Sequence, residues 1–549
     1  MRNSITVDLF DRLSRRRIRR VMRGYRFLKV SNQLGRVATV KETLTNTRLN
    51  QCKGLTLHYI FGAGTGDVEL IVRQYLLIRV CGLNLNKSLL YALGKPGSAV
   101  VHPLPREWRK VVEQHGFKVA RVRSALAWNG FVALFLVYGM VVIARQLVGS
   151  VKEIFCPAFR TLGRFAYFGA LTAGNLPRPC KDGRSHDILT WYQRWPGRVT
   201  GLDTLCHSVE GRTLSAIDGL PVISVLSAIT PLTHTGALVR YIGWSLTSIL
   251  LAAFDILRGH WWHAIMLGEA SLAATIRMQE SDSLARDYLF HNSNYIYRPL
   301  WTYEAEKQGS RVTFYFYSTN CESFKRPTGY PKLMYGWQAM NWSHYLVWDE
   351  YQANFVRRAV GEDVNISVVG PIWFQGSNCE MPQVEKPGVA VFDVTPHRSS
   401  CYCVLGADYE FYIPATSEGF LSHIADAVCQ VSAVMLWKRK RKIGAIAHPR
   451  YRYFTERLSA RKDIVLVDPE ISALQVIEAS CAVISMPFTS TALIARALGK
   501  PSVYYDPTGE LQSDDRAAHG IPIVSGSEQL KTWLDSHAVS IKRGKYLTN

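Results

Sequence analysis

Three short motifs in the carboxyl-terminal third of the chain carry side chains that can bind a phosphate or a nucleotide. They are a turn with His397 and Arg398, a turn with His448, Pro449 and Arg450, and a cluster of Ser485, Thr489, Ser490 and Thr491. Imidazole, guanidinium and hydroxyl groups all donate hydrogen bonds to phosphate oxygens. Each motif also has a plainer interpretation, as a helix cap or a proline-containing turn, and the residues alone leave both open.

The elements that must position these motifs alternate over residues 388–537. Apolar runs of strand length lie at 389–394, 442–447, 464–467, 482–485, 502–505 and 521–524. Helical periodicity lies between them, at 420–435, 454–460, 472–480, 491–498 and 528–536. This pattern predicts a doubly wound α/β domain with a parallel sheet. Because ligands bind at the carboxyl ends of such strands, we expect the three motifs to share one edge.

A second α/β domain is expected upstream, over residues 51–374. Strands are predicted at 98–102, 119–122, 288–291, 312–317 and 366–369, and helices at 107–115, 301–308 and 353–360. The polar segment 375–388, with Gly376 and two prolines, is interpreted as a linker. The expected organisation is therefore a basic arm (1–50), an acceptor-side domain (51–374), a nucleotide-binding domain (388–537) and a basic tail (538–549).

The charge balance indicates an anionic partner. The chain has 549 residues, and its 65 Lys and Arg against 43 Asp and Glu give a formal charge of +22. Ten basic and two acidic residues fall in the first thirty, with apolar residues at helical spacing. This predicts an amphipathic helix on anionic lipid, with a nucleic-acid arm or a solvated arm as alternatives. No zinc or RNA-binding motif is seen, so we expect no nucleic-acid partner.

Two apolar stretches, 125–144 and 241–254, are candidates for contact with a membrane. The first is long enough to span a bilayer, and basic residues flank it. A span, helices lying in the interface, and buried core helices are the alternatives. We favour the last two, since one span would separate the halves of a domain.

The eleven cysteines form no CxxC pair and the chain shows no secretory signal, which favours reduced thiols in the cytoplasm and no structural metal site. Two other motifs are weak. The glycine-rich segment 62–67 is interpreted as a strand–helix turn, with a ligand loop as the alternative. The basic run 438–442 is interpreted as a solvated helix end.

Taken together, the His-Pro turn and the later Ser/Thr cluster resemble the CMP-binding signature of bacterial sialyltransferases and polysialyltransferases. The segment 484–507 (ISMPFTSTALIARALGKPSVYYDP) is similar also to bacterial 3-deoxy-manno-octulosonate (Kdo) transferases and related surface-carbohydrate biosynthesis proteins. The resemblance covers residues 360–510 well. It implies a GT-B fold, in which two Rossmann-like domains face a crevice and the second holds the donor nucleotide.

The resemblance also implies roles for single residues. His448 and Pro449, with Arg450 beside them, would meet the CMP phosphate and ribose, and the Ser/Thr cluster would bind the phosphate. Arg398, beside His397, would meet the sugar carboxylate. These families also use a carboxylate in the first domain, in a short acidic motif that this chain lacks. Glu322 is the candidate here, with Asp349 and Glu350 as alternatives that suit a helix start.

We therefore expect a glycosyltransferase that moves an acidic keto sugar, Kdo first of all, from its CMP-activated form to a surface polysaccharide or lipid-linked acceptor. No cofactor or metal is expected, and the chain is expected on the inner face of the cytoplasmic membrane, peripherally or with a single span. A transferase that uses a UDP- or GDP-sugar, and a membrane-associated scaffold without activity, are the alternatives.

Overall fold

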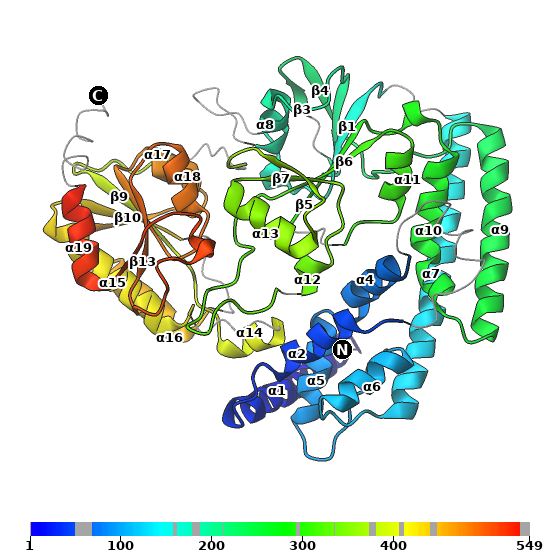
Figure 1. Cartoon of the computed structure of the whole chain (residues 1–549), viewed down its shortest axis with the longest axis horizontal. Coiled ribbons are helices and arrows are strands. Elements are labelled where there is room, and N and C mark those ends of the chain that lie inside the picture. The colour runs from blue at the N-terminus through cyan, green and yellow to red at the C-terminus, as the bar shows by residue number, and fades with distance from the viewer. Residues whose placement is uncertain are drawn as a thin grey trace.

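The structure, a computed structural model, describes residues 2–49, 68–156, 162–177, 187–211, 214–292, 297–333, 335–372, 380–405, 411–439 and 447–537. The expected glycine-rich segment 62–67 and basic tail 538–549 lie outside the described residues. Figure 1 shows two sheets side by side and a group of amino-terminal helices below them. The long helices α7 (Arg121–Phe155), α9 (Thr235–Leu257) and α10 (Trp262–Met278) stand at one edge of the molecule.

The second sheet confirms the doubly wound domain predicted from the sequence. All its strands pair in parallel, in the order β11-β10-β9-β12-β13-β14. The strands are β9 (Gly388–Asp393), β10 (Val434–Arg439), β11 (Ile464–Val467), β12 (Ala482–Ser485), β13 (Ser502–Asp506) and β14 (Ile523–Ser525). Its helices are α15 (Pro414–Gln430), α16 (Pro449–Leu458), α17 (Ala473–Glu478), α18 (Thr491–Ala497) and α19 (Gly526–Ser536), and a shorter α14 (Ser399–Leu405) precedes them.

One prediction in this domain needs correction. The helix expected over 420–435 ends at Gln430, and Val434 already belongs to strand β10. The chain turns at Ser432, whose φ of 56° lies in the left-handed region that stops a helix. Residues 442–446 of the strand expected just before His448 lie outside the described part of the chain, so that strand stays a prediction. Strand β10, over Val434–Arg439, was not predicted from the sequence.

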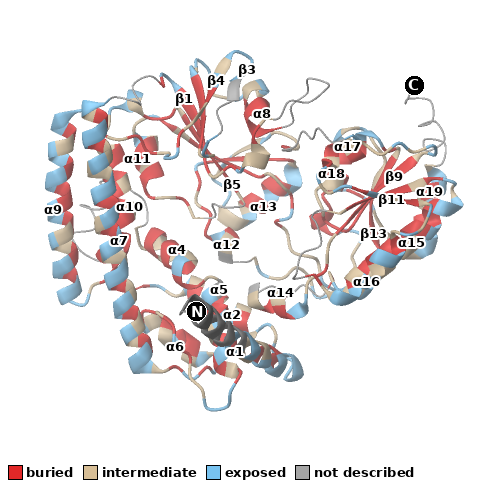
Figure 2. Cartoon of the chain, turned by 180° about the vertical axis from the view of Figure 1, so that it is seen from behind, coloured by how far each residue is buried: buried red, intermediate tan, exposed pale blue. Residues whose placement is uncertain are grey.

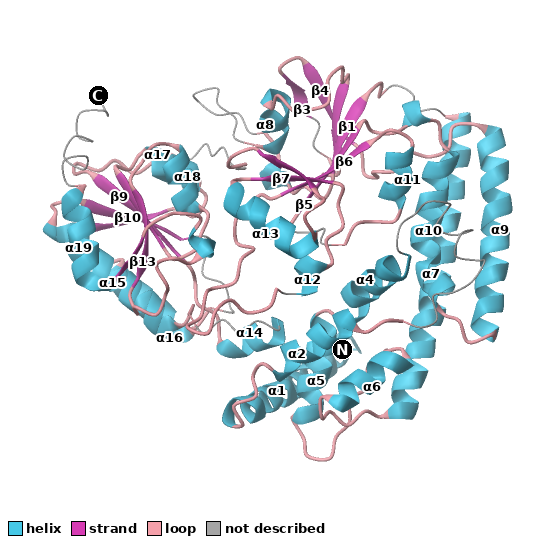
Figure 3. Cartoon of the chain, in the orientation of Figure 1, coloured by secondary structure: helices cyan, strands magenta, loops and turns pink. Residues whose placement is uncertain are grey.

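The first sheet has the strand order β3-β4-β2-β1-β5-β6-β7-β8, parallel throughout except for the β3–β4 pair. The predicted strand–helix–strand unit is present as β5 (Asp287–His291), α11 (Trp301–Lys307) and β6 (Arg311–Tyr315). The other strands are β1 (Phe165–Phe168), β2 (Thr204–His207), β3 (Leu214–Ile217), β4 (Leu220–Ser224), β7 (His344–Val347) and β8 (Asn365–Val368). The helices α8 (Ile188–Arg194), α12 (Tyr335–Gln338) and α13 (Glu350–Val360) complete this domain (Figure 3).

The two domains face each other through the loops that follow their strands. The backbone N–H of Thr319, in the loop after β6, donates a hydrogen bond of 3.1 Å to Ser490 Oγ in the loop after β12. Carboxyl-terminal strand ends of both parallel sheets therefore meet at one interface. The architecture is the GT-B fold that the resemblance implied.

The strands expected at 98–102 and 119–122 are wrong. Only an isolated bridge joins Val100 to Val119, and the long helix α7 begins at Arg121. Ser124, in the first turn of that helix, donates a buried hydrogen bond to the Val100 carbonyl oxygen. The apolar run 125–144 favours a helix, and that helix begins at Arg121, directly after the bridge. No residues are therefore left to form a strand at 119–122.

The amino-terminal arm is not free along its whole length. The amino-terminal helices are α1 (Arg2–Val30), α2 (Arg36–Asn46), α4 (Val68–Val80), α5 (Leu83–Leu93) and α6 (Arg106–Gln114). In the last turns of α1, Tyr25 and Leu28 are buried, and Gly24 lies so close to α5 that a Cβ would meet the Leu90 carbonyl oxygen at 1.9 Å. Ile18, earlier on the expected apolar stripe, is exposed. Part of that stripe is therefore core and is unavailable to lipid.

Acid is expected to destabilise the first sheet through His344, at the start of β7. His344 is 8% exposed, and burial together with the Arg311 charge lowers its pKa to about 4. The unfolded imidazole titrates near pH 6.5, so stability is lost as the pH falls from about 6.5 through 4.

His344→Gln should remove about 3 kcal/mol of the stability loss between pH 7 and pH 4, measured from urea unfolding at both pH values. A wild-type profile in His344→Gln would contradict the assignment.

Candidate active site between the two sheets

The strand order of the second sheet places a crevice between β9 and β12. Chain order reverses direction there, because β10 and β11 lie on one side of β9 while β12 to β14 lie on the other. Loops after neighbouring strands diverge at such a switch point and leave room for a ligand. The loop after β9 carries His397 and Arg398, and the loop after β12 carries the Ser/Thr cluster. Two of the three motifs from the sequence therefore flank the switch point.

The third motif is drawn to the same edge by backbone contacts. His397 forms an isolated bridge with Ala447, and the His448 N–H donates to the Pro396 carbonyl oxygen at 3.0 Å. His448 is the N-cap of α16, where its Nδ1 accepts the Arg450 N–H at 3.2 Å. An accepting Nδ1 has no proton, so the neutral ring carries its N–H at Nε2. That N–H suits an oxygen acceptor such as a phosphate or a ribose.

The arginines of these turns differ in their availability. Arg450 makes a bidentate ion pair with Glu418 of α15, with N–O distances of 2.8 and 2.6 Å. Arg398 is exposed beside the switch point. The ring of His397 has a buried Nδ1 with no hydrogen-bond partner among the described residues. The geometry thus favours Arg398 over Arg450 as the cation that meets an anionic ligand.

The β12–α18 loop (Met486–Ser490) is held rigidly by tyrosines. Tyr412 donates to the Pro487 carbonyl oxygen at 2.9 Å, and Tyr504 donates to the Thr489 carbonyl oxygen at 2.7 Å. Phe488 is 5% exposed and has a φ of 63°, in the left-handed region that β-carbon-bearing residues avoid. A bulky residue there is a marked outlier, and such strain is found where surrounding contacts over-determine the backbone.

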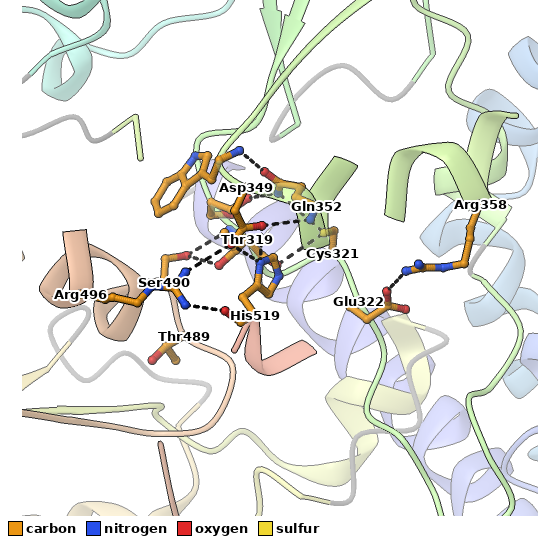
Figure 4. Close-up of polar contacts among 12 residues, drawn as sticks. Thr319, Cys321, Glu322, Asp349, Gln352, Arg358, Thr489, Ser490, Arg496 and His519 are labelled. Carbon is orange, nitrogen blue, oxygen red and sulfur yellow. Dashed lines mark hydrogen bonds and ion pairs between the residues drawn. The ribbon is translucent and has the colours of Figure 1, made fainter. Parts of the chain in front are cut away.

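The hydroxyls of the cluster divide into two groups. Ser485 and Thr491 lie 2.8 Å apart, Oγ to Oγ1, and Thr489 is 3.2 Å from Thr491. Ser490 instead donates to Asn320 Oδ1 at 3.1 Å and accepts from the Thr319 backbone (Figure 4). Although Ser490 occupies the N-cap position of α18, it makes no side-chain cap. The plain cap interpretation is therefore wrong for Ser490, which joins the two domains.

Two of the three carboxylates considered from the sequence, Glu322 and Asp349, lie at this interface in ion pairs. Glu322, with a 4% exposed side chain, contacts Arg358 of its own domain and Arg516 of the other, at 3.1 Å. Asp349 caps α13 by accepting the Gln352 N–H, as its position before a helix predicted. Figure 4 shows these groups around the interface.

Asp349 also lies 2.8 Å from Nδ1 of His519 and 3.5 Å from Arg496, both of the second domain. Each of the two carboxylates therefore ties the domains together, and the catalytic role of either stays a prediction. The third, Glu350, stands in the first turn of α13, 3.8 Å from Arg357 of the same helix.

Comparison with known proteins names the family. Residues 244–534, more than half of the chain, match the model of a family described as "Polysaccharide biosynthesis PFTS motif protein". The sequence Pro-Phe-Thr-Ser occurs once in the chain, at residues 487–490, within the β12–α18 loop. The chain belongs to this polysaccharide biosynthesis PFTS motif family. No curated protein sequence matches it.

Solved structures similar to this PFTS motif protein share little sequence with it. The wall teichoic acid polymerase TagF, in a variant form, has a TM-score of 0.37 at 10% identity, over 74% of this chain and 92% of that chain. The glycotransferase of kitacinnamycin has a TM-score of 0.34 at 10% identity, over 70% and 93%. Os79 from O. sativa, in complex with UDP, has a TM-score of 0.32 at 13% identity, over 69% and 94%. The fold assignment rests on the topology described above.

Several residues of the interface had no signal in the sequence of this PFTS motif protein. Arg516 and His519 follow no motif, and Arg496 lies within the segment 484–507 without a role predicted for it. Only tertiary contact brings these residues to the carboxylates of the first domain. His291 could have been found, because it ends strand β5 next to the β1–β5 switch point of the first sheet. Burial lowers the pKa of His291, which keeps its imidazole neutral and able to accept a proton near neutral pH.

Two features outside the crevice were considered as sites. Among the described residues, no group of three or more His, Cys, Asp or Glu is placed to hold a metal ion. A cavity of about 470 Å³ lies at the opposite edge of the first sheet, beside Phe165 of β1. Four residues of its lining are already paired with each other, His234 at 3.2 Å from Glu280 and Arg286 at 2.7 Å from Asp282. The crevice between the sheets is therefore the better candidate.

Proposed function

We propose that this PFTS motif protein is a glycosyltransferase of surface polysaccharide assembly. Its proposed donor is a CMP-activated acidic keto sugar, and the particular sugar proposed is Kdo. The observation that carries the proposal is the convergence of the PFTS loop, the His397–Arg398 turn and the His448 turn at one switch point. Hydroxyl, imidazole and guanidinium donors are gathered there, opposite the first domain. The acceptor is a growing polysaccharide or a lipid-linked glycan.

The donor site suits departure of CMP without a metal ion. When the bond from the sugar to the phosphate breaks, negative charge grows on the phosphate and positive charge on the sugar ring. Preorganised donors that are aimed at the phosphate stabilise this change. We assign that role to His448 Nε2 and to the hydroxyls of Ser485, Thr489 and Thr491. Arg398 is assigned to the sugar carboxylate, as a bidentate partner.

A nucleotide panel tests the proposal directly. Calorimetric titration of the full-length protein with CMP, UDP and GDP should show binding of CMP above the other two. Preference for UDP or GDP would overturn the donor assignment and leave a transferase of another donor class. Binding of no nucleotide, together with no sugar transfer from CMP-Kdo, would favour the scaffold.

Substitution of His448 should separate binding from folding. His448→Asn keeps a good N-cap but loses the Nε2 donor, so CMP affinity should fall by about 1–3 kcal/mol at unchanged stability. His448→Ala loses both and should also destabilise the protein by about 1 kcal/mol. Calorimetry and thermal melts measure the two effects. Unchanged CMP affinity in a folded His448→Asn protein would contradict the role.

We also propose that the protein works on the inner face of the cytoplasmic membrane, where a lipid-linked acceptor is found. Two of its helices, α7 (Arg121–Phe155) and α9 (Thr235–Leu257), are long and apolar enough to cross a membrane. Length and composition are weak support by themselves, because buried core helices share them.

A further inference from the structure

The apolar helices form a layer whose inner member is buried and whose outer members are not. Helix α10 (Trp262–Met278) is buried along most of its length, between α7, α9 and α11. By contrast, only 22% of the most apolar window of α7 and 33% of that of α9 are buried. Figure 2 shows this contrast, with exposed residues along α7 and α9. A core-helix explanation therefore fits α10 but does not fit α7 and α9.

Large apolar side chains line the outer surface of these two helices at helical spacing. On α7 they include Leu126, Leu134 and Val137, which are 66%, 64% and 51% exposed. On α9 they include Leu246, Leu250 and Leu257, which are 60%, 70% and 86% exposed. We call this surface the α7–α9 face. Large exposed apolar side chains gathered on one side of a helix mark a site of interaction.

Charged residues border the α7–α9 face but do not interrupt it. No Asp, Glu, Lys or Arg occurs between Ser124 and Ala144 of α7, or between Tyr241 and Phe254 of α9. Exposed arginines stand just outside these stretches, at Arg121, Arg123, Arg145, Arg240 and Arg258. An apolar face with cations at its borders is complementary to acyl chains and anionic headgroups.

The packing of α7 allows lipid on one side only. A Cβ on Gly139 would meet the Leu267 side chain of α10 at 2.7 Å, so the two helices are in close contact. Trp128 of α7 meets Trp261 just before α10, with ring centroids 5.0 Å apart. The inner side of α7 is thus covered by protein, whereas a membrane-spanning helix outside a bundle is surrounded by lipid.

The two ends of α7 also belong to one body. Its first residue follows the amino-terminal helices, and its last residue leads towards β1 of the first sheet. Those helices contact the rest of the protein directly. Glu42 of α2 pairs with Lys332 at 2.6 Å, and Asn86 of α5 donates to the Val404 carbonyl oxygen at 2.8 Å. A bilayer crossed by α7 would have to separate parts that are in contact.

We infer that the α7–α9 face docks the protein onto an anionic bilayer from one side, with both helices lying in the plane of the interface. This docking mode rests on the location proposed above, the inner face of the cytoplasmic membrane, and adds which surface of the protein contacts that membrane. The apolar side chains enter the boundary between headgroups and acyl chains, and the bordering arginines meet the phosphates. The acceptor of the transferase would then be a lipid-linked glycan in the bilayer on which the first domain docks.

Vesicle flotation with paired glutamate substitutions tests the inference. Full-length protein is floated with vesicles of phosphatidylcholine alone and of phosphatidylcholine with phosphatidylglycerol. Wild type should float, and more strongly with the anionic vesicles. Leu246→Glu combined with Leu250→Glu should lower vesicle binding by about tenfold or more, because two charges enter the apolar boundary. Both positions are exposed, so the fold should be retained.

A matched control introduces the same charges elsewhere. Val368→Glu combined with Tyr453→Glu alters two exposed apolar residues, 47% and 64% exposed, away from the α7–α9 face. This variant should float like wild type. CMP titration of wild type and of both variants distinguishes the donor proposal from the docking proposal. If the wild-type protein floats as expected but does not bind CMP, only the donor assignment is overturned.

Three outcomes would overturn the docking surface. One is equal flotation of wild type and the Leu246→Glu/Leu250→Glu variant. Another is a wild-type dimer that ignores vesicles and becomes a monomer in that variant, which would make the face a contact between two copies. The third is protection of one end of α7 from trypsin added outside sealed vesicles while the other end is cut, which would show a span.

Discussion

Replacing Glu322 with glutamine is expected to destabilise the protein by about 3 kcal/mol, because it leaves the charges of Arg358 and Arg516 without their shared carboxylate. The carboxylate is 4% exposed and the two arginine side chains are 32% and 31% exposed, so water can replace only part of the lost contact. The loss should be seen in the midpoint of urea or thermal unfolding. Glu322→Gln combined with Arg516→Gln should recover part of it, since the second change removes one unpaired charge.

The same substitution distinguishes a positioning carboxylate from a catalytic one. If Glu322 took the acceptor proton, Glu322→Gln would abolish turnover at nearly unchanged stability. If it holds the domains together, stability should fall, and turnover should fall with it as the crevice loosens. The exposed pair Arg450–Glu418 within the second domain provides the control. Glu418→Gln should cost much less than Glu322→Gln, because exposed ion pairs contribute little to stability.

Truncating Phe488 of the PFTS loop is expected to cost about 3–5 kcal/mol, the usual effect of replacing a buried Phe with Ala. Its ring contacts Phe324 of the first domain, with centroids 4.6 Å apart, and Tyr504 of β13 at 5.7 Å. Loss of these contacts should also displace Thr489 and Ser490, so CMP affinity should fall as well. Unfolding curves and calorimetry measure the two effects.

The backbone of Phe488 offers a sharper version of this test. The φ of 63° at position 488 is freely accessible to glycine, whereas alanine in this left-handed conformation is strained by about 1–2 kcal/mol. Phe488→Gly should therefore be more stable than Phe488→Ala. The order should reverse at Phe420, which is buried in the middle of helix α15, because glycine costs about 1 kcal/mol relative to alanine there. If the glycine variant were the more stable one at both positions, or the less stable one at both, the conclusion that the Phe488 backbone is strained would be contradicted.

The second domain was readable from the sequence because its structure is local and repetitive. Strands covered by helices on both faces need continuous apolar runs, such as 464–467 and 482–485, and these stand out between helical segments. The shared position of the three motifs could also be predicted, since parallel strands end at a common edge. Pairing of β9 with β12 then put His397 and the Ser/Thr cluster on the two sides of one switch point.

Other features depended on contacts between residues that are far apart in the chain. Composition and local sequence patterns do not predict such contacts. Glu322 meets Arg516 across 194 positions, so a carboxylate that looked catalytic was found in an interdomain ion pair. The arm seemed to carry one free apolar stripe, yet Tyr25 and Leu28 belong to the core. Most of all, α7, α9 and α10 are all apolar, and only packing makes α10 an inner helix and leaves α7 and α9 exposed. Hydrophobicity determines that a helix avoids water, but the tertiary structure decides whether protein or lipid covers it.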